Sequence, residues 1–450
     1  MVTSRIFGTD GVRGVANRDL TPEMTFRIGR AAAGILAGER NRPIIVGRDT
    51  RLSGTMLEAA LVAGIASTGR DALTVGILPT PGVAHITVAR DAAAGIMISA
   101  SHNPIEDNGI KIFGADGFKL DDFREGEIER AVADDSALPR PTHTAVGIVR
   151  RAPELVDRYV TSLVAQGDDL SALTVVVDCA FGAAYEVGPA AFARLGAKVE
   201  PLHARDDGTR INVACGSTDL RTLAEHVRAL SAAQPAAHVI GVAFDGDADR
   251  ALFVDEAGDV KTGDHVMLIL GREKKRRGTL ACDTVVGTVM SNVGLERALQ
   301  AEGIALSRAP VGDRYVLERL RESGATFGGE QSGHIIDLTR NTTGDGPATA
   351  IALAALIARE GTTLRELSAS LHVAPQILVN VRTARRDVLD HDEVRAAIVH
   401  AERELGQGGR ILVRASGTEP LVRVMIEGDD RRRIETLAYG VAESIERAAQ

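Results

Sequence analysis

Three aspartates alternate along the segment DGDADR (245–250), directly after the apolar stretch VIGVAF. Asp245, Asp247 and Asp249 would place hard carboxylate oxygens on one side of an extended turn, which suits Mg²⁺. Like charges this close repel one another unless a cation compensates them. An EF-hand is disfavoured because Arg250 replaces its required glycine and a strand precedes the segment. An acidic turn that caps a helix stays open as an alternative, but the pattern favours a metal site.

The segment SASHNP (99–104) ends another apolar stretch and places Ser101 next to His102, with Lys111 a short distance further on. A serine can carry a phosphoryl group, and a cation held by the aspartates could neutralise that group. Only six of the 52 basic residues are lysines. A lysine can exchange a proton once its pKa is lowered, whereas an arginine cannot. The combination favours phosphoryl transfer over the alternative, an Asn-Pro turn with serine caps.

The segment GGEQSGH (328–334) offers hydrogen-bonding side chains between glycines. Glu330 and Ser332 suit the hydroxyl groups of a sugar, and His334 adds an imidazole. A glycine-rich turn without a ligand is equally consistent with this segment when it is taken alone.

The segment RASGTEPLVR (414–423) has two arginines around a short polar stretch. Hydroxyl groups, backbone N–H groups and a glycine that permits close approach are typical of a phosphate-binding loop. An ordinary hairpin is the alternative. The candidate phosphate ligands are Arg414, Ser416, Gly417, Thr418 and Arg423.

A further polar segment, VGRDTRLSG (46–54), has two interpretations. Ser53 could cap a helix while an arginine and an aspartate form an ion pair. Alternatively, the segment supports a neighbouring loop or an interface.

Composition excludes several classes of function. The chain of 450 residues carries a net charge of −9, has 3% aromatic residues and no tryptophan, so binding to nucleic acid is not expected. Neither a Walker A loop nor a Rossmann fingerprint occurs. The longest apolar run (348–358) is too short to cross a bilayer, and the first residues lack the apolar segment of a signal peptide. Three widely spaced cysteines fit a reducing cytoplasm, so we expect a cytoplasmic protein that binds no membrane.

One pattern of strands and helices occurs three times before residue 370, and each copy ends in one of the polar loops SASHNP, DGDADR and GGEQSGH. Alternating strands and helices predict α/β layers in which ligands bind beyond the carboxyl ends of the strands. The tail instead predicts the order β-α-β-β-α, with the RASGTEP loop between two strands. We therefore predict four domains: 1–150, 151–252, 253–370 and 371–450.

In this order, these loops resemble the α-D-phosphohexomutase superfamily over essentially the whole chain. The resemblance is greatest to the bacterial phosphoglucosamine mutases, because of the opening FGTDGVRG, the loop PVGDRYV (310–316), Gln331 and NTTGDG (341–346). Phosphomannomutase/phosphoglucomutase relatives tend to carry another residue at Gln331 and a histidine within the loop that here reads Gly312-Asp313-Arg314. A phosphomannomutase/phosphoglucomutase is therefore the alternative; a sugar phosphatase and a non-catalytic sensor are weaker ones.

The resemblance implies three similar α/β domains with mixed sheets and a C-terminal α+β domain, like the TATA-binding protein, around a central cleft. It also implies a homodimer that acts on a small sugar phosphate. The implied reaction converts glucosamine 6-phosphate to glucosamine 1-phosphate through a phosphoserine and glucosamine 1,6-bisphosphate, and supplies UDP-N-acetylglucosamine for peptidoglycan.

The resemblance also implies a role for each candidate residue. Ser101 would carry the phosphoryl group and would bind one Mg²⁺ together with the three aspartates. Lys111 is the first candidate for the general base and His334 the second. The resemblance implies that the transferring phosphoryl group is contacted by Arg13, His102 and Arg250. It implies that the sugar is contacted by Gly312, Asp313, Glu330 and Ser332. The implied ligands of the non-reacting phosphate are Arg414, Ser416, Gly417, Thr418 and Arg423.

Overall fold

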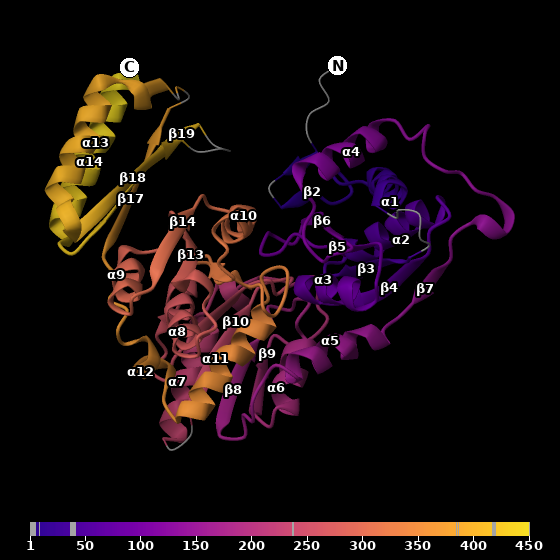
Figure 1. The fold of residues 1–450 in the computed structure, drawn as a ribbon, viewed down its shortest axis with the longest axis horizontal. Helices are drawn as coiled ribbons and strands as arrows, with labels where there is room; N and C mark the ends of the chain where they lie inside the picture. Colours follow the sequence, from indigo (N-terminus) through magenta and orange to yellow (C-terminus); the bar gives the residue numbers. More distant parts are fainter. Residues whose placement is uncertain are drawn as a thin grey trace.

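The structure is a computed structural model of the chain (Figure 1). It describes residues 6–8, 10–36, 42–235, 238–383, 385, 387–415 and 420–449. The strands are β1 (Phe7–Gly8), β2 (Gly11–Val15), β3 (Ile44–Arg48), β4 (Ala72–Ile77), β5 (Ala94–Ile98), β6 (Asp107–Gly114), β7 (Val149–Arg151), β8 (Leu173–Asp178), β9 (Lys198–Leu202), β10 (His238–Phe244), β11 (Ala251–Val254), β12 (Val260–Lys261), β13 (Thr284–Thr288), β14 (Ala305–Ala309), β15 (Phe327–Gly329), β16 (Ile335–Asp337), β17 (Gln376–Arg382), β18 (Gly409–Ala415) and β19 (Leu421–Gly428).

The α-helices are α1 (Pro22–Leu36), α2 (Ser53–Ala66), α3 (Thr80–Ala89), α4 (Asp122–Ala133), α5 (Glu154–Val164), α6 (Val187–Arg194), α7 (Arg221–Ala233), α8 (Gly263–Arg276), α9 (Val293–Ala301), α10 (Asp313–Ser323), α11 (Gly346–Glu360), α12 (Leu364–Ser368), α13 (Asp392–Leu405) and α14 (Arg431–Ala449). None of these helices, within the described ranges, is long and apolar enough to cross a membrane.

The first sheet has the strand order β1-β2-β6-β5-β3-β4-β7. Strands β5, β3, β4 and β7 are parallel, whereas β6, β2 and β1 add on in antiparallel fashion. Every residue of β5 is buried, as expected for a central strand that is covered on both faces. The sheet is therefore mixed, and its antiparallel part begins directly after the SASHNP loop.

The second and third sheets repeat this arrangement with the orders β12-β11-β10-β8-β9 and β14-β13-β15-β16. Strand β10 is parallel to β8 and antiparallel to β11, and β15 is parallel to β13 and antiparallel to β16. In all three domains the polar loop connects the last parallel strand to an antiparallel one. The predicted fold class of three similar domains with mixed sheets is thereby confirmed.

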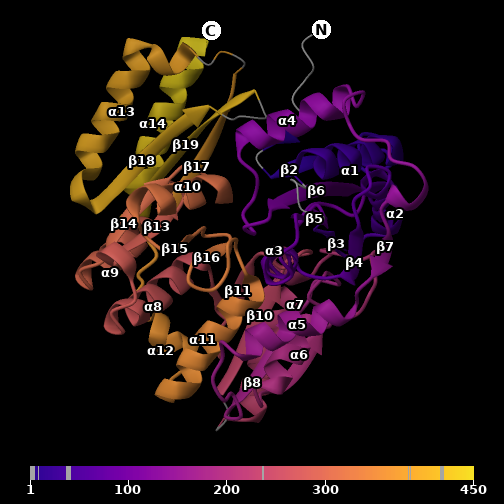
Figure 2. The same cartoon turned by 45° about the vertical axis from the view of Figure 1, so that its right-hand side comes forward.

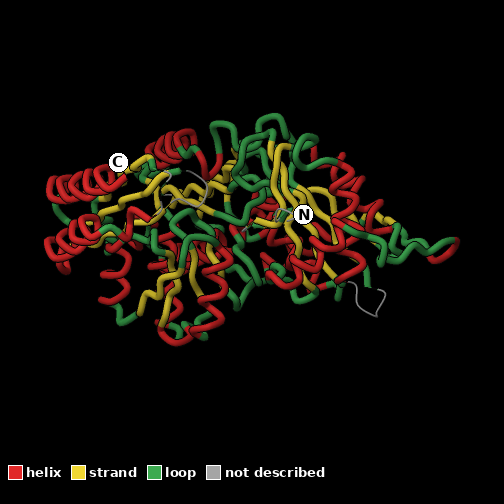
Figure 3. The backbone as a smooth tube through the Cα atoms, turned by 90° about the horizontal axis from the view of Figure 1, so that it is seen from above, coloured by secondary structure: helices red, strands yellow, loops and turns green. Residues whose placement is uncertain are grey.

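The tail forms a three-stranded antiparallel sheet in the order β17-β19-β18, and α13 and α14 pack together beside it (Figure 1). The predicted order β-α-β-β-α is therefore confirmed. Seen from above, this domain and the long connection between α4 and β7 lie at opposite ends of the molecule (Figure 3).

Two of the predicted boundaries fall close to or within paired strands. Strand β7 (Val149–Arg151) pairs with β4 of the first sheet, and β11 (Ala251–Val254) pairs with β10 of the second. The charged stretch after residue 121 begins with α4, which packs on α1 and buries Ile128.

The apolar core is continuous through the first three domains. One cluster includes Met97 of the first sheet, Phe192 and Phe244 of the second domain, and Phe327 and Leu353 of the third. The fourth domain has a separate cluster, which includes Val424 and Ile445. The three α/β domains are thus fixed to one another by shared packing, whereas the fourth is attached through fewer contacts.

Candidate active site

Ser101 lies directly beyond β5 and has a left-handed backbone conformation, with φ of +54°. Its side chain is buried, and Oγ donates a hydrogen bond to Asp245 Oδ2 at 2.5 Å. Asp245 follows β10 of the second domain. The structure therefore brings the predicted phosphoryl carrier together with the first of the three predicted metal ligands.

The carboxylates of Asp245, Asp247 and Asp249 are all buried, and one oxygen of each lies within 4.8 Å of the others. Asp247 Oδ1 and Asp249 Oδ1 have no hydrogen-bond partner in the described part of the chain. Burial, followed by the charges of Asp249 and Asp247, raises the pKa of Asp245 well above its usual value. Partnerless buried oxygens and uncompensated repulsion are what a divalent cation would relieve, so this donor set fits Mg²⁺.

The metal-ligand loop is held by the domains on either side of it. Thr80, at the start of α3, donates its backbone N–H to the Asp247 carbonyl at 2.9 Å and its hydroxyl to Asp247 Oδ2 at 2.5 Å. Gly346, at the start of α11, donates to the carbonyl of Ala248 at 3.1 Å, and Ala248 has a φ of +55°. All three α/β domains therefore contribute to the shape of this loop.

Lys111 lies on β6 with its ammonium group among carboxylates. Its Nζ is 2.8 Å from Asp247 Oδ2, 3.1 Å from Asp249 Oδ2 and 3.2 Å from Asp10 Oδ2. Burial alone would lower the pKa of Lys111, but the charges of Asp10, Asp247 and Asp249 raise it well above its usual value. In this arrangement the pKa of Lys111 is therefore not lowered, as a lysine base would require.

His334 lies just before β16 and is buried, with neither ring nitrogen bonded to any group in the described ranges. Nε2 is 3.8 Å from Asp313 Oδ2 and 4.0 Å from Asp249 Oδ2. The ring rests against Gly344, where an added Cβ would be 2.4 Å from Nε2. The NTTGDG segment (341–346), for which the sequence indicated no role, therefore packs against the ring of His334.

Arg13 and His102 lie around the Ser101 loop. Arg13 Nη1 donates to the carbonyl of Ala100 at 2.9 Å and to Asn103 Oδ1 at 3.1 Å. The pKa of His102 is lowered to about 4, first by the partial desolvation of its ring and then by the charges of Arg250 and Arg13. His102 is therefore neutral near pH 7 in this arrangement.

Arg250 follows the metal-ligand loop, and its backbone N–H donates to Asp245 Oδ1 at 3.4 Å. Its guanidinium Nε is 3.9 Å from Asp249 Oδ1. Although burial opposes the charge, the surrounding carboxylates of Asp245 and Asp249 raise the pKa of Arg250. It therefore remains a fixed cation beside the site.

Glu330 joins two of the predicted sugar-binding segments. Its Oε1 accepts from the backbone N–H of Gly312 at 3.0 Å, and its Oε2 accepts from the hydroxyl of Ser332 at 3.4 Å. Asp313, the first residue of α10, forms an ion pair with Lys119 of the first domain. The structure thus brings all four predicted sugar-binding residues to one region.

Asp10 and Lys119 are site residues that the sequence reasoning missed. Asp10 forms ion pairs with Arg13, Lys111 and Lys119, and these cations hold its pKa well below the usual range despite burial. The rarity of lysine was the available signal for Lys119, and the FGTDGVRG motif was the signal for Asp10. Neither signal indicated that Lys119 also pairs with Asp313.

A cleft of about 520 Å³ lies next to these groups and is lined by residues of the first three domains. In Figure 2 the fourth domain lies beyond α10, across from β2 and α4. The predicted site residues on the wall of the cleft are Arg13, His102, Asp249, Arg250, Gly312, Asp313, Glu330 and His334.

The predicted phosphate-binding loop lies in the fourth domain. Arg414 on β18 and Arg423 on β19 are directly opposite in the antiparallel register. The other predicted members, Ser416, Gly417 and Thr418, lie outside the described residues. The two arginines are therefore neighbours, although the structure does not place them on the wall of the cleft.

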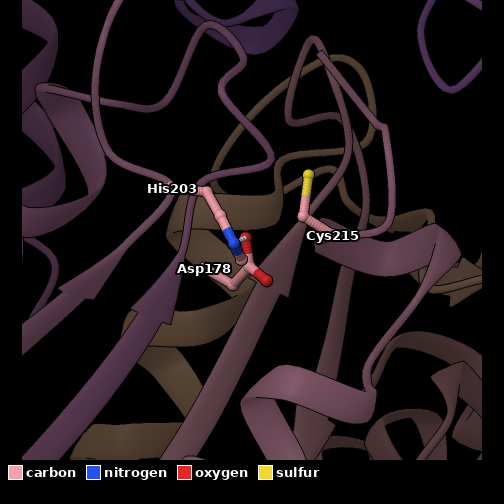
Figure 4. A group of neighbouring side chains, drawn as sticks. All are labelled: Asp178, His203 and Cys215. Carbon is pink, nitrogen blue, oxygen red and sulfur yellow. Dashed lines mark hydrogen bonds and ion pairs between the residues drawn. The ribbon is translucent and has the colours of Figure 1, made fainter. Parts of the chain in front are cut away.

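A second group of metal-ligand types, Asp178, His203 and Cys215, lies in the second domain (Figure 4). His203 Nδ1 is 3.0 Å from Asp178 Oδ1, whereas the sulfur of Cys215 points away from this pair. Asp178 also accepts from the backbone N–H groups of Ala180 and Gly216, at 2.9 and 3.0 Å. Burial raises the pKa of the Cys215 thiol to about 12. The contacts of Asp178 order the loop that contains Gly216.

Comparisons with known proteins show the family to which the chain belongs. Models of the phosphoglucomutase/phosphomannomutase alpha/beta/alpha domains I, II and III match residues 4–138, 157–258 and 262–373, and the model of the C-terminal domain matches residues 378–444. The chain belongs to the phosphoglucomutase/phosphomannomutase family. The predicted superfamily and enzyme class are thereby confirmed.

The names of its relatives indicate which enzyme of this family the chain resembles. The chain is 52% identical over 441 residues to a phosphoglucosamine mutase of Moorella thermoacetica, which covers 97% of this chain and 98% of the relative. It is 51% identical over 447 residues to that of Symbiobacterium thermophilum, with 98% of each chain covered. A phosphoglucomutase/phosphomannomutase family protein of Burkholderia thailandensis shares the fold with a TM-score of 0.84 at 24% identity, covering 100% of this chain and 98% of that one.

Proposed function

We propose that this chain is a phosphoglucosamine mutase, which interconverts glucosamine 6-phosphate and glucosamine 1-phosphate. The observation that carries the proposal is the contact of Ser101 Oγ with Asp245 in a buried group of three carboxylates, next to the cleft. The identity of about 50% to phosphoglucosamine mutases over nearly the whole chain supports the choice of sugar. The product would feed the synthesis of UDP-N-acetylglucosamine for peptidoglycan.

In the first half-reaction, the bond between Ser101 Oγ and phosphorus breaks and a bond from phosphorus to the sugar O1 forms. The proton of the O1 hydroxyl passes to a base on the chain, which leaves glucosamine 1,6-bisphosphate. After this intermediate reorients, Ser101 Oγ takes the phosphoryl group from O6, and O6 regains a proton. Mg²⁺ bound by Ser101 and the three aspartates would neutralise charge on the phosphoryl group.

We rank His334 ahead of Lys111 as the base, which reverses the order expected from the sequence. His334 lines the cleft, and its ring nitrogens have no partner within the described ranges, so one of them can accept a hydroxyl proton. The ammonium group of Lys111 is instead occupied by Asp10, Asp247 and Asp249. Lys111 would then hold these carboxylates in place and balance their charge.

The remaining roles follow from position and chemistry. Arg13, His102 and Arg250 surround the Ser101 loop and would contact the transferring phosphoryl group. Glu330 and Ser332, with Gly312 and Asp313, would bind the sugar hydroxyls. The non-reacting phosphate would be bound by Arg414, Ser416, Gly417, Thr418 and Arg423, which requires the fourth domain to approach the cleft.

A coupled assay tests the proposal. Purified protein is supplied with Mg²⁺, a trace of sugar bisphosphate, and glucosamine 6-phosphate, glucose 1-phosphate or mannose 1-phosphate. We expect a strong preference for glucosamine 6-phosphate that Ser101→Ala abolishes, because the variant has no phosphoryl acceptor, while Ser162→Ala on α5 retains activity.

A preference for glucose or mannose phosphate would instead favour the phosphomannomutase/phosphoglucomutase alternative. Substantial turnover by Ser101→Ala would contradict the phosphoserine mechanism itself.

We also propose that the protein works in the cytoplasm as a homodimer. All three cysteines are free in the structure, as expected in a reducing compartment. The dimer rests on the resemblance to the superfamily, and sedimentation of the purified protein tests it.

A further inference from the structure

Both backbone polar atoms of Ser101 are held in place. Its N–H donates to Ser99 Oγ at 2.9 Å, and its carbonyl accepts from Arg51 Nη2 at 3.0 Å and from Asn212 Nδ2 at 2.9 Å. A serine with φ of +54° is strained, and such a conformation persists only where the surroundings over-determine it. The contacts that supply this constraint come from two domains.

Arg51 is completely buried, and all five of its guanidinium N–H groups are used. Nε donates to Asp49 Oδ2 at 3.0 Å. The other four donate to the backbone carbonyls of Ser101 at 3.0 Å, Asn103 at 2.8 Å, Asp107 at 2.9 Å and Pro104. A planar guanidinium can bind four carbonyls along one loop, whereas an ammonium group has three donors at one point.

Asp49 links Arg51 to the other side of Ser101. Its Oδ1 accepts the backbone N–H of Arg51 at 2.9 Å, and its Oδ2 accepts the hydroxyl of Ser99 at 2.6 Å. The Ser99 oxygen in turn accepts the N–H of Ser101. The VGRDTRLSG segment therefore supports the Ser101 loop. The alternative of a Ser53 cap is wrong, because α2 has Leu52 at its N-cap and no side-chain cap bond.

Asn212 makes the same contact from the second domain. It also has a left-handed backbone, with φ of +60°, and lies in the loop between His203 and Gly216 that Asp178 orders. Its contact with the Ser101 carbonyl makes the conformation of the phosphoryl carrier depend on the docking of two domains.

We propose that Arg51 and Asn212 are positioning residues for phosphoryl transfer, which hold the Ser101 backbone so that Oγ faces Asp245. Both residues act through the backbone, and neither lines the cleft. Without them, Ser101 would relax toward an unstrained conformation and Oγ would no longer face Asp245. Substrate binding would change little, because the sugar-binding residues lie elsewhere. The catalytic part of this inference rests on the proposed function.

The first test is Arg51→Lys, with Arg30→Lys as its matched control. Arg30 is an equally buried arginine of the same domain, paired with Asp135 at 2.8 Å and not in contact with the Ser101 loop. We expect Arg51→Lys to lower kcat about 10- to 100-fold with KM changed less than about twofold, and to slow phosphorylation of Ser101 by sugar bisphosphate, as measured by intact mass. The control should retain both.

A second pair keeps the proposal testable if Arg51→Lys fails to fold. Asn212→Asp replaces the donor with an acceptor and tolerates the same backbone conformation, and Asn17→Asp is the control at an exposed turn with φ of +62°. Asn212→Asp should lower kcat in the same way. Unchanged kcat in a folded Arg51→Lys or in Asn212→Asp would overturn the proposal.

Hydrogen exchange of the 99–107 segment separates this proposal from the proposed function, because it needs no turnover. Exchange should be faster in Arg51→Lys and Asn212→Asp than in their controls. If exchange accelerates while no mutase activity is found in the unmodified protein, the proposed function fails and the structural part stands. If exchange is unchanged, the positioning role fails.

Discussion

Lys111 forms ion pairs with two of the three candidate metal ligands, Asp247 and Asp249. Its Nζ contacts the Oδ2 atoms of Asp247 and Asp249, and Asp249 Oδ1 lies 3.9 Å from Arg250 Nε, whereas Asp247 Oδ1 has no hydrogen-bond partner in the described ranges. Burial opposes the charge of Asp249, but Lys111 and Arg250 lower its pKa to about 2, whereas burial and the neighbouring carboxylates raise the pKa of Asp245. The side of the group that faces Ser101 is therefore where a divalent cation would gain most.

Mg²⁺ should stabilise the folded protein at this site, independently of activity. At a concentration 100 times its Kd, the gain would be about 2.7 kcal/mol, seen as a higher melting temperature that EDTA reverses. Asp245→Asn should abolish most of this Mg²⁺-dependent shift while keeping the ion pairs of Lys111, and Asp206→Asn, in an exposed loop, should keep it. An equal shift in Asp245→Asn would contradict the assignment of the ligands.

His334→Gln tests the choice of base. We expect kcat to fall about 10²- to 10⁴-fold, the usual contribution of a positioned general base, with a smaller change in KM. His400→Gln, on an exposed face of α13, is the control. If His334→Gln retains most of kcat while Lys111→Arg loses it, Lys111 would be the base and our ranking would be reversed.

At the scale of elements, the three active loops occupy equivalent places: each connects a parallel strand to its antiparallel neighbour. Loops at the carboxyl ends of parallel strands can converge on one cleft. The start of α8 is held by a local contact of a different type. The backbone N–H of Thr262 donates to His265 Nδ1 at 3.1 Å. This bond requires His265 to be neutral.

The start of α8 should therefore make stability depend on pH. Burial, and then the charge of Lys261, lowers the pKa of His265 from 6.5 to about 4. Between these values the unfolded chain binds the proton that the folded chain excludes, so stability falls as pH falls from 6.5 to 4, by an amount on the order of 1–3 kcal/mol. Denaturant unfolding from pH 7 to 4 should show a smaller loss for His265→Gln than for the unmodified chain; an equal loss would exclude His265 as the cause.

At the scale of the whole molecule, Lys119 connects domains that are far apart in sequence. It pairs with Asp10 of the first domain and Asp313 of the third, and both carboxylates line the cleft. Burial disfavours the charge of Lys119, but these two carboxylates raise its pKa above the usual value. The ion pairs add a polar link to the apolar core that the first three domains share.

Lys119→Met should lower both stability and kcat/KM. Breaking a fully buried pair costs about 3–5 kcal/mol, and we expect about 1–3 kcal/mol here because the carboxylates retain some contact with water. Lys198→Met, an exposed lysine paired with Glu200, should cost less than about 1 kcal/mol. Equal losses in chemical unfolding would show that Lys119 is not a link between domains.

Local patterns predicted the elements well because each carries its own signal. The buried run before Ser101 predicted a central strand, and alternating aspartates predicted a cation site whose orphaned oxygens the structure contains. The segment 279–286 is largely apolar, but β13 begins only at Thr284 because residues 281–283 form a 3₁₀ turn with Cys282 at φ of +57°. Local backbone conformation overrode the apolar pattern there.

Contacts between distant segments could not be predicted in this way. Nothing in the sequence near Arg51 specifies that four of its five guanidinium donors meet a loop about fifty residues away, or that Asn212 reaches the carbonyl of Ser101 as well. The pKa of Lys111 likewise depends on Asp10, Asp247 and Asp249, which come from two other segments. Sequence spacing indicates which groups are available, whereas the packing of domains decides their charge states.

The separate apolar core of the fourth domain has a consequence for how the protein unfolds. In the described ranges, polar contacts around the start of α9 attach this domain: buried Glu427 accepts the backbone N–H of Val293, Arg410 donates to the carbonyl of Ser291, and Asp429 pairs with Arg297. Domains with their own cores can melt as separate cooperative units. Calorimetry should therefore resolve more than one transition, and a single melting temperature would not describe this chain.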